Sequence, residues 1–375
     1  MKQLTRFALG LCGLGLALTA DAQNSNLRGH GFELDLHEAR ADKVIISQDL
    51  PDYPSATVRR GQEGWVRVHY VVTADGHAAD PIVLDSSGGV GFEEEARKVL
   101  VTWRFEAPAS GVELPDNQVI IRSEMENGRD KATPNFMRRY ARIVNAVRAD
   151  KIAEARKSVD SAYKLGGWNL YESTMLWLMM GRVESAEGNL QGKLECYRRA
   201  LGVSTRGILR RADKIDLLEK IFRMEDEFGQ HAEALGTYGA LIRALKDNSP
   251  SAEIEARAQE IQALIEGPDA LVAQATIYNP CNCEAGEPLW HYKPARRTFS
   301  FANLSGNVTR FEARCEKQRI RGQVEADQFW TLEPEWGNCR IFVFGEDGAT
   351  FEVLEYADTV ARDDVLDPRN RGQRG

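Results

Sequence analysis

The sequence predicts a multidomain α+β protein, because three stretches of the chain follow different residue patterns. Residues 48–130 combine a strand pattern with a helical one, residues 134–266 repeat apolar residues at spacings of three and four, and residues 273–360 are rich in aromatic residues and turn signals. A chain of 375 residues normally exceeds one hydrophobic core. We therefore expect a two-layer α+β unit, a helical-hairpin region and a small β-rich unit linked by disulfides.

The first residues have the pattern of a secretory signal peptide. Lys2 and Arg6 precede an apolar run that ends at Leu18, and small residues around Ala22 suit a cleavage site. The run is shorter than the roughly 20 residues that a membrane-spanning helix needs. We expect cleavage of residues 1–22 near Ala22, which gives a periplasmic protein with no stable membrane span. An uncleaved anchor in the inner membrane is the alternative.

After an N-terminal segment, residues 23–47, the α+β unit begins with a predicted β-hairpin. The alternation over residues 65–72 points Val66, Val68, Tyr70 and Val72 one way, which predicts a strand with one buried face. Asp75-Gly76 is expected to supply the positive backbone dihedrals of a tight turn before a returning strand.

A helix is predicted to cover this hairpin. Phe92, Ala96, Val99, Leu100 and Trp103 recur at helical spacing, and three glutamates occupy the favourable first turn. The preceding glycine-rich run lacks the Lys-Ser or Lys-Thr of a phosphate-binding loop, so we interpret it as a hinge. A further strand is expected within residues 117–126, which completes two layers.

The landmarks of residues 48–126 occur in the order and spacing of a known domain. They are Tyr53-Pro54, Gly61, Gly64, Asp75-Gly76, Ser86-Ser87 and the Trp103 to Pro108 run. The segment resembles a TonB C-terminal domain. The resemblance implies a protein-interaction module of TonB-dependent transport, which binds an extended peptide of an outer-membrane transporter and adds it as a strand to its own sheet. The implied partner is a protein or peptide, such as a TonB-dependent outer-membrane transporter.

Strand addition needs an open sheet edge, where backbone hydrogen bonds supply affinity. The predicted partner-binding edge consists of Gln118, Val119, Ile120, Ile121, Arg122 and Ser123. The alternative is that a neighbouring domain shields this edge and the TonB-like unit is structural. Family members normally place this domain last, after an anchor and a proline-rich spacer, whereas more than 250 residues follow Pro108 here. The resemblance is therefore not extended from peptide binding to energy transduction.

Three helix pairs are predicted over residues 134–266, and their second helices align with offsets of 38 and 41 residues. The aligned triplets are Ala155, Val159 and Ala162, then Lys193, Tyr197 and Ala200, then Ala234, Tyr238 and Leu241. With Trp177 and Met180-Gly181, they resemble tetratricopeptide repeats, whose period is about 34. A degenerate repeat solenoid suits a periplasmic scaffold or assembly factor with a concave binding surface. Candidate contacts are Arg198, Arg199, Arg210 and Arg211, against the alternative of a solvated face.

Four strands are predicted in the β-rich unit: Arg297 to Ala302, Val308 to Cys315, Cys339 to Phe344 and Ala349 to Tyr356. The charged tail, residues 361–375, is expected to be disordered.

The cysteines of the β-rich unit, Cys281, Cys283, Cys315 and Cys339, are expected to form two disulfides in an oxidising compartment. A Cys281–Cys283 link would close a very small ring, so each is expected to reach Cys315 or Cys339, and both pairings stay open. A zinc site or a redox pair is the alternative, although neither has the usual C-x-x-C spacing. Cys196 is expected to be a buried free thiol.

Charge and motifs give no support for nucleic-acid binding or catalysis. The net charge of −8 becomes −9 after loss of the signal, which argues against nucleic acid. The six histidines are scattered, without H-E-x-x-H, and no Gly-x-Ser-x-Gly occurs. We predict no enzyme activity, no metal and no small-molecule cofactor. The alternative enzyme site would lie around Trp290, His291, Trp330 and Trp336, aromatic residues that equally suit a core.

Overall fold

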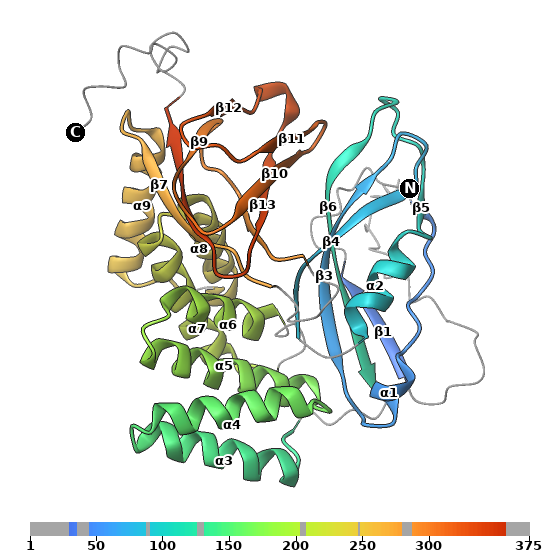
Figure 1. The fold of residues 1–375 in the computed structure, drawn as a ribbon, viewed down its shortest axis with the longest axis vertical. Coiled ribbons are helices and arrows are strands. Elements are labelled where there is room, and N and C mark those ends of the chain that lie inside the picture. The colour runs from blue at the N-terminus through green and yellow to red at the C-terminus, as the bar shows by residue number, and fades with distance from the viewer. Residues whose placement is uncertain are drawn as a thin grey trace, which may run out of the picture.

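In the computed structural model, the described residues are 30–35, 45–87, 91–125, 131–202, 208–246, 248–279 and 287–357. They form three units that contact one another (Figure 1). We call them the sheet-and-helix unit (residues 30–125), the helical region (residues 131–266) and the sandwich (residues 271–357). The mixed α+β architecture predicted from the sequence is confirmed. The predicted signal peptide and C-terminal tail lie outside the described residues.

The sheet-and-helix unit contains an antiparallel four-stranded sheet in the order β1-β6-β3-β4. Helix α2 covers one face of this sheet. The bounds are β1 (His30–Asp35), β3 (Gly64–Val72), β4 (Ala78–Ser86), α2 (Phe92–Leu100) and β6 (Leu114–Met125), with a short α1 (Ser55–Val58) and a small sheet of β2 (Ile45–Ser47) and β5 (Arg104–Phe105).

The β3–β4 turn differs from its predicted geometry. Gly76 has a φ of 83°, whereas Asp75 does not have a positive φ. The backbone N–H of Gly76 donates to the Thr73 carbonyl at 2.9 Å, and the N–H of Thr73 donates to the His77 carbonyl at 2.8 Å. The prediction of two positive dihedrals is therefore wrong, because the longer turn needs only one left-handed residue. Glycine is required there, since a Cβ on Gly76 would overlap the carbonyl oxygen of Phe105.

Both faces of β3 are buried, not one. Val66, Val68 and Tyr70 pack in the core beneath α2, as predicted. On the opposite face, Trp65 and His69 are 0% exposed. The prediction treated the hairpin in isolation, but the face away from α2 packs against the other two units. The sheet is thus the middle layer of the molecule.

Within its described residues, the helical region contains the helices α3 to α9, and the first six of these pack as pairs α3·α4, α5·α6 and α7·α8. Their bounds are α3 (Pro134–Arg148), α4 (Ile152–Leu165), α5 (Leu170–Ala186), α6 (Leu190–Gly202), α7 (Arg211–Glu227), α8 (His231–Leu245) and α9 (Ala252–Glu266). The Oγ of Ser251 caps α9 by accepting from the Ile254 N–H at 3.3 Å. An aromatic ring fills the close approach of α5 and α6, where Tyr197 packs on Gly181.

Replacement of Gly181 by alanine is expected to destabilise the helical region. A Cβ there would lie 2.7 Å from Tyr197 Cε1, an overlap that costs about 1–3 kcal/mol and outweighs a helix-propensity gain of about 1 kcal/mol. Gly236 in α8 is the matched control, because a Cβ there meets no atom within 4 Å. In urea unfolding, Gly181→Ala should lower the midpoint and Gly236→Ala should raise it. Equal shifts would contradict the packing argument.

The sandwich consists of two four-stranded antiparallel sheets, β11-β10-β13-β8 and β12-β9-β14-β7. The four predicted strands are β9 (Thr298–Ser305), β10 (Val308–Cys315), β13 (Cys339–Gly345) and β14 (Thr350–Tyr356). The additional strands are β7 (Leu271–Thr276), β8 (Leu289–Tyr292), β11 (Arg319–Gln323) and β12 (Phe329–Thr331), with a 3₁₀ helix, η2 (Pro334–Trp336). Aromatic side chains such as Phe299, Phe301 and Phe311 fill the core.

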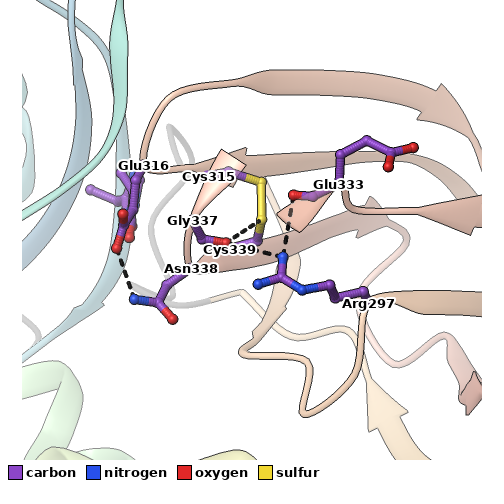
Figure 2. Close-up of a disulfide and its surroundings, with 9 residues drawn as sticks. Arg297, Cys315, Glu316, Glu333, Gly337, Asn338 and Cys339 are labelled. Atoms are coloured by element: carbon purple, nitrogen blue, oxygen red, sulfur yellow. Dashed lines mark hydrogen bonds and ion pairs between the residues drawn. A yellow bond between two sulfur atoms is a disulfide. The ribbon is translucent and has the colours of Figure 1, made fainter. Parts of the chain in front are cut away.

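A disulfide joins Cys315 to Cys339, which corrects the predicted pairing (Figure 2). The two residues are direct cross-strand partners of β10 and β13, with Cα atoms 3.9 Å apart. Ring size favoured pairing either of them with Cys281 or Cys283, but strand register decides which cysteines meet. Cys281 and Cys283 lie outside the described residues. Cys196 is a buried free cysteine, as predicted.

The disulfide lies beside the polar loop between η2 and β13 (Figure 2). Arg297 donates to the Glu333 carbonyl at 3.2 Å, and Asn338 donates to Glu316 Oε1 at 2.8 Å.

Within the described ranges, every helix falls short of the length and apolarity needed to cross a bilayer.

Candidate protein-interaction site

The predicted partner-binding strand is β6, and it is not an open edge in this structure. On one side it pairs with β3, from Gly64↔Ser123 to Val72↔Leu114. On the other side it pairs with β1, from His30↔Met125 to Asp35↔Ile120. The prediction that residues 118–123 form a free edge is therefore wrong for Ile120 to Ser123. The cause is a strand from the N-terminal segment, to which the sequence analysis assigned no structure.

A sequence signal for β1 exists in the alternation of His-Gly-Phe-Glu-Leu-Asp over residues 30–35. It is too short to be distinctive, because strands of six residues with two apolar positions occur often by chance. Among the described residues, β1 pairs with Ile120 to Met125 of β6, and β3 pairs with the other side of the same strand.

The side chains of β6 are largely buried. Val119 and Ile121 lie in the core beneath α2, whereas Ile120 packs with Trp65 and Leu170 on the opposite face. Arg122 is 1% exposed. A peptide that paired with β6 would therefore meet mainly its backbone N–H and C=O groups, as strand addition requires.

The sheet is attached to the helical region by a buried ion pair. Asp85 at the end of β4 accepts from Arg199 of α6 at 2.7 Å, and both side chains are at least nine-tenths buried. The guanidinium of Arg199 stacks 4.6 Å from the Trp177 ring, and Trp177 Nε1 donates to the Ser87 carbonyl at 3.2 Å. Burial raises the pKa of Asp85 to about 6, against the opposing effects of Arg199 and Arg67.

A second attachment lies at the start of α5. The carboxylate of Glu63 accepts from the Leu170 N–H and from the Met125 N–H, both at 3.0 Å. One side chain thus connects the loop before β3, the end of β6 and the first turn of α5, where negative charge is favourable.

The sandwich contacts the same face of the sheet through His69. Its Nε2 lies 2.8 Å from Asp116 Oδ1, and its Nδ1 lies 3.2 Å from Arg314 Nη1. Because Arg314 can only donate, Nδ1 accepts and the proton of the neutral ring belongs on Nε2, facing Asp116. Burial lowers the pKa of His69 to about 4, which outweighs the hydrogen bond and charge of Asp116.

Apolar and charged contacts surround this histidine. Leu84 of β4 clusters with Leu289, Phe342 and Phe344 of the sandwich. Arg314 also donates to the Asp80 carbonyl at 3.0 Å. The interface is therefore a mixed apolar and ionic contact between packed elements, not a surface left open for a partner.

The candidate arginines of the helical region do not form one solvated face. Arg198 pairs with Glu195 and Glu225 at 2.9 and 2.8 Å, and Arg199 is the buried partner of Asp85. Arg210 is exposed and pairs with Asp213, whereas Arg211 donates to the Ala244 carbonyl at the end of α8. Three of the four, Arg198, Arg199 and Arg211, therefore connect different elements within the molecule.

The aromatic residues considered for an enzyme site belong to the sandwich core or pack against it. Trp290 is 2% exposed and stacks on Tyr292, while Trp330 and Trp336 pack against the same core. His291 lies apart, with its Nδ1 3.1 Å from Arg340 Nη1. In the part of the chain that the structure describes, no group of three histidine, cysteine or acidic side chains could hold a metal ion.

Comparisons with known proteins match the sheet-and-helix unit. Residues 49–144 match the family model of the Gram-negative bacterial TonB protein C-terminal, so the resemblance predicted for residues 48–126 is confirmed. Protein TonB of Pseudomonas aeruginosa is 37% identical over 78 residues, which are 21% of this chain and 23% of that protein. Protein TonB of Yersinia enterocolitica is 34% identical over 65 residues, which are 17% of this chain and 26% of that protein.

A solution NMR structure of the Pseudomonas aeruginosa TonB CTD is 29% identical and covers 26% of this chain and 95% of its own, with a TM-score of 0.20. The chain spans about a quarter of the length of the TonB proteins it matches. The match therefore concerns one domain.

Proposed function

We propose that the sheet-and-helix unit is a TonB-like protein-interaction module of TonB-dependent transport, and that it binds an extended peptide by strand addition at β6. The observation that carries this proposal is the β1–β6 pairing within a segment similar to TonB C-terminal domains. It provides a geometry in which a short extended segment adds to β6 antiparallel, over six residues. The partner class is a protein or peptide, with a segment of an outer-membrane transporter as the specific case.

In this proposal, the partner peptide takes the place of β1. Two strands cannot occupy the same side of β6, since each N–H and C=O of its edge serves one neighbour. The peptide must therefore displace β1 from Ile120 to Met125. Exchange breaks the backbone hydrogen bonds between β1 and β6 and forms equivalent hydrogen bonds with the incoming peptide.

A tether between β1 and β6 tests this exchange in the full-length protein. The pair Gly31↔Glu124 provides the register for a disulfide in the double variant Gly31→Cys, Glu124→Cys. A second variant replaces residues 30–35 by a Gly-Ser repeat. The probes are fluorescent peptides of residues 28–37 and of the periplasmic N-terminal segment of a TonB-dependent transporter from the same bacterium, with affinity measured by anisotropy.

We expect the Gly-Ser variant to bind both peptides at least 10-fold more tightly than the wild type, and the oxidised tethered variant to bind neither. Reduction should restore wild-type binding to the tethered variant. Wild-type protein with and without reductant controls for the Cys315–Cys339 disulfide, and thermal unfolding controls for folding. Equal transporter-peptide binding by tethered and wild-type protein would contradict binding at β6.

A second candidate function is a periplasmic scaffold or assembly factor in which the TonB-like unit is structural. The burial of Trp65, His69 and the Asp85–Arg199 pair between the units favours it. In that case, the transporter peptide binds none of the variants above, and a partner protein binds the helical region instead.

The proposed location is the periplasm after cleavage near Ala22, with an uncleaved inner-membrane anchor as the alternative. Fractionation with N-terminal sequencing separates the two. A soluble mature chain that begins at Gln23 supports the first, and an intact N-terminus in the membrane fraction supports the second.

A further inference from the structure

A cavity of about 370 Å³ lies where the three units meet. Strands β3 and β6 of the sheet-and-helix unit, helices α6, α7 and α8, and strands β8 and β13 of the sandwich all contribute to its lining. Its volume falls in the lower part of the range of small-molecule sites, which is about 300–1,000 Å³. Gln118, Ile120 and Arg122 of β6 line the cavity, whereas β1 pairs with the backbone edge of the same strand.

Basic residues dominate the charge of this cavity. The basic residues in its lining are Arg67, Arg122, Arg198, Lys214, Lys293 and Arg340. Two carboxylates accompany them, Glu225 and Glu233. The lining thus carries an excess of positive charge, although the whole chain is acidic. An excess of one sign of charge in a cleft attracts a ligand of the other sign, because the low-dielectric walls focus the electric field.

Both carboxylates already have partners at the cavity wall. Glu225 accepts from Arg198 at 2.8 Å and from Thr237 at 2.6 Å. Glu233 pairs with Arg340 at 3.1 Å and accepts from the Lys293 N–H at 3.2 Å. These ion pairs account for Arg198 and Arg340, and they leave Arg67 and Lys214 outside the two pairs.

The side chain of Arg67 gives a second, independent observation that points to a bound anion. Its Nε is buried and has no hydrogen-bond partner among the described residues. A buried guanidinium donor without an acceptor is costly, and a bound oxyanion would satisfy it. Burial lowers the pKa of Arg67, and the nearby Arg340 lowers it further while Asp85 opposes.

His291 adds a neutral donor to the lining. Arg340 Nη1 lies 3.1 Å from His291 Nδ1, and because the guanidinium can only donate, Nδ1 accepts and Nε2 carries the proton. Burial, followed by the charges of Arg340, Arg198 and Arg67, keeps the pKa of His291 well below its usual value. The histidine therefore adds hydrogen bonding without adding charge.

The cavity also has apolar walls, to which Ile120, Leu218 and Ile221 contribute. We propose that it binds a small organic oxyanion, a carboxylate or phosphate carried on a compact apolar body. Arg67 and Lys214 attract the charged group, and the apolar walls contact the rest of the molecule. Because all three units line the site, the ligand stabilises their association, and this inference does not depend on peptide binding at β6.

Thermal unfolding and calorimetry of the full-length protein test the proposal with phenyl phosphate and benzoate as probes. Sodium chloride at matched ionic strength is the salt control. We expect a saturable rise in Tm with at least one probe, as ligand binding to the folded state requires. The probe that binds more tightly identifies phosphate or carboxylate as the preferred group.

Arg67→Gln and Lys214→Gln each should weaken binding at least 10-fold, whereas Arg210→Gln, at an exposed arginine, should not change it. The use of two cavity variants on different units keeps the test valid if one of them folds poorly. The proposal would be overturned if neither phenyl phosphate nor benzoate bound saturably. Equal binding by wild type and both cavity variants would overturn it as well.

Discussion

Replacement of Asp85 by alanine is expected to lower the free energy of unfolding by about 3–5 kcal/mol, the usual cost of removing one partner of a buried ion pair. The change leaves Arg199, which is 7% exposed, without the carboxylate 2.7 Å away. The ion pair that is lost connects β4 to α6, so the replacement should also weaken the attachment of the sheet-and-helix unit to the helical region. Chemical denaturation gives the free energy, and limited proteolysis of the sheet-and-helix unit reports the loosening.

Asp213→Ala is the matched control, because it removes the same type of pair at an exposed site, where Arg210 has an 84% exposed side chain. Its effect should be far smaller, since exposed pairs contribute little. The double variant Asp85→Ala, Arg199→Met should recover part of the loss, because it removes the uncompensated charge. Equal effects at Asp85 and Asp213 would contradict the role assigned to burial.

The second large effect concerns pH and His69. Its pKa is about 4 in the folded protein, so between pH 6.5 and 4 the unfolded chain binds a proton at this residue and the folded chain does not. The contribution of His69 to the free energy of unfolding is fully present above pH 6.5. It decreases as the pH falls towards 4, by up to about 1.4 kcal/mol per pH unit. Asp85 opposes this trend, because its raised pKa makes its contribution fall as pH rises from 3.8 to about 6.

Comparison with His69→Gln isolates the histidine from Asp85. Glutamine keeps one donor and one acceptor for Asp116 and Arg314 but does not titrate. The stability advantage of wild type over this variant should shrink steadily from pH 6.5 towards pH 4 in denaturation experiments. His77→Gln, on the exposed hairpin turn, is the control for the replacement of a histidine by glutamine outside the buried interface. A pH-independent difference for His69→Gln would contradict the assignment of a neutral histidine.

The sequence predicted the elements whose patterns are local. The alternation of β3, the helical spacing of α2 and the four long strands of the sandwich all appear where their residues indicate. Gly181 lies beside Tyr197 at the close approach of α5 and α6, one of the predicted helix pairs. Such features depend on neighbours within one element or one helix pair, which periodicity reports directly.

Apart from the local error in the β3–β4 turn, the errors concern contacts between distant segments. Nothing in the neighbourhood of Gln118 indicates that β1, about 90 residues earlier, pairs with the same strand. Likewise, the register of β10 against β13 determines the partner of Cys315, and ring size does not. The lining of the cavity comes from all three units, so no single motif could predict it. The cavity could therefore be identified only from the three-dimensional structure, whereas the TonB-like domain could be recognised from the sequence.

The pairing of β1 with β6 also determines when this sheet can be completed. His30 meets Met125, so during synthesis the first strand has no place to join until some 95 further residues have been made. Such long-range pairing forms slowly compared with the local β3–β4 hairpin. In that interval the newly made β6 presents backbone groups that any extended chain can take. When β1 pairs with β6, it covers the strand edge at which two nascent copies would otherwise pair.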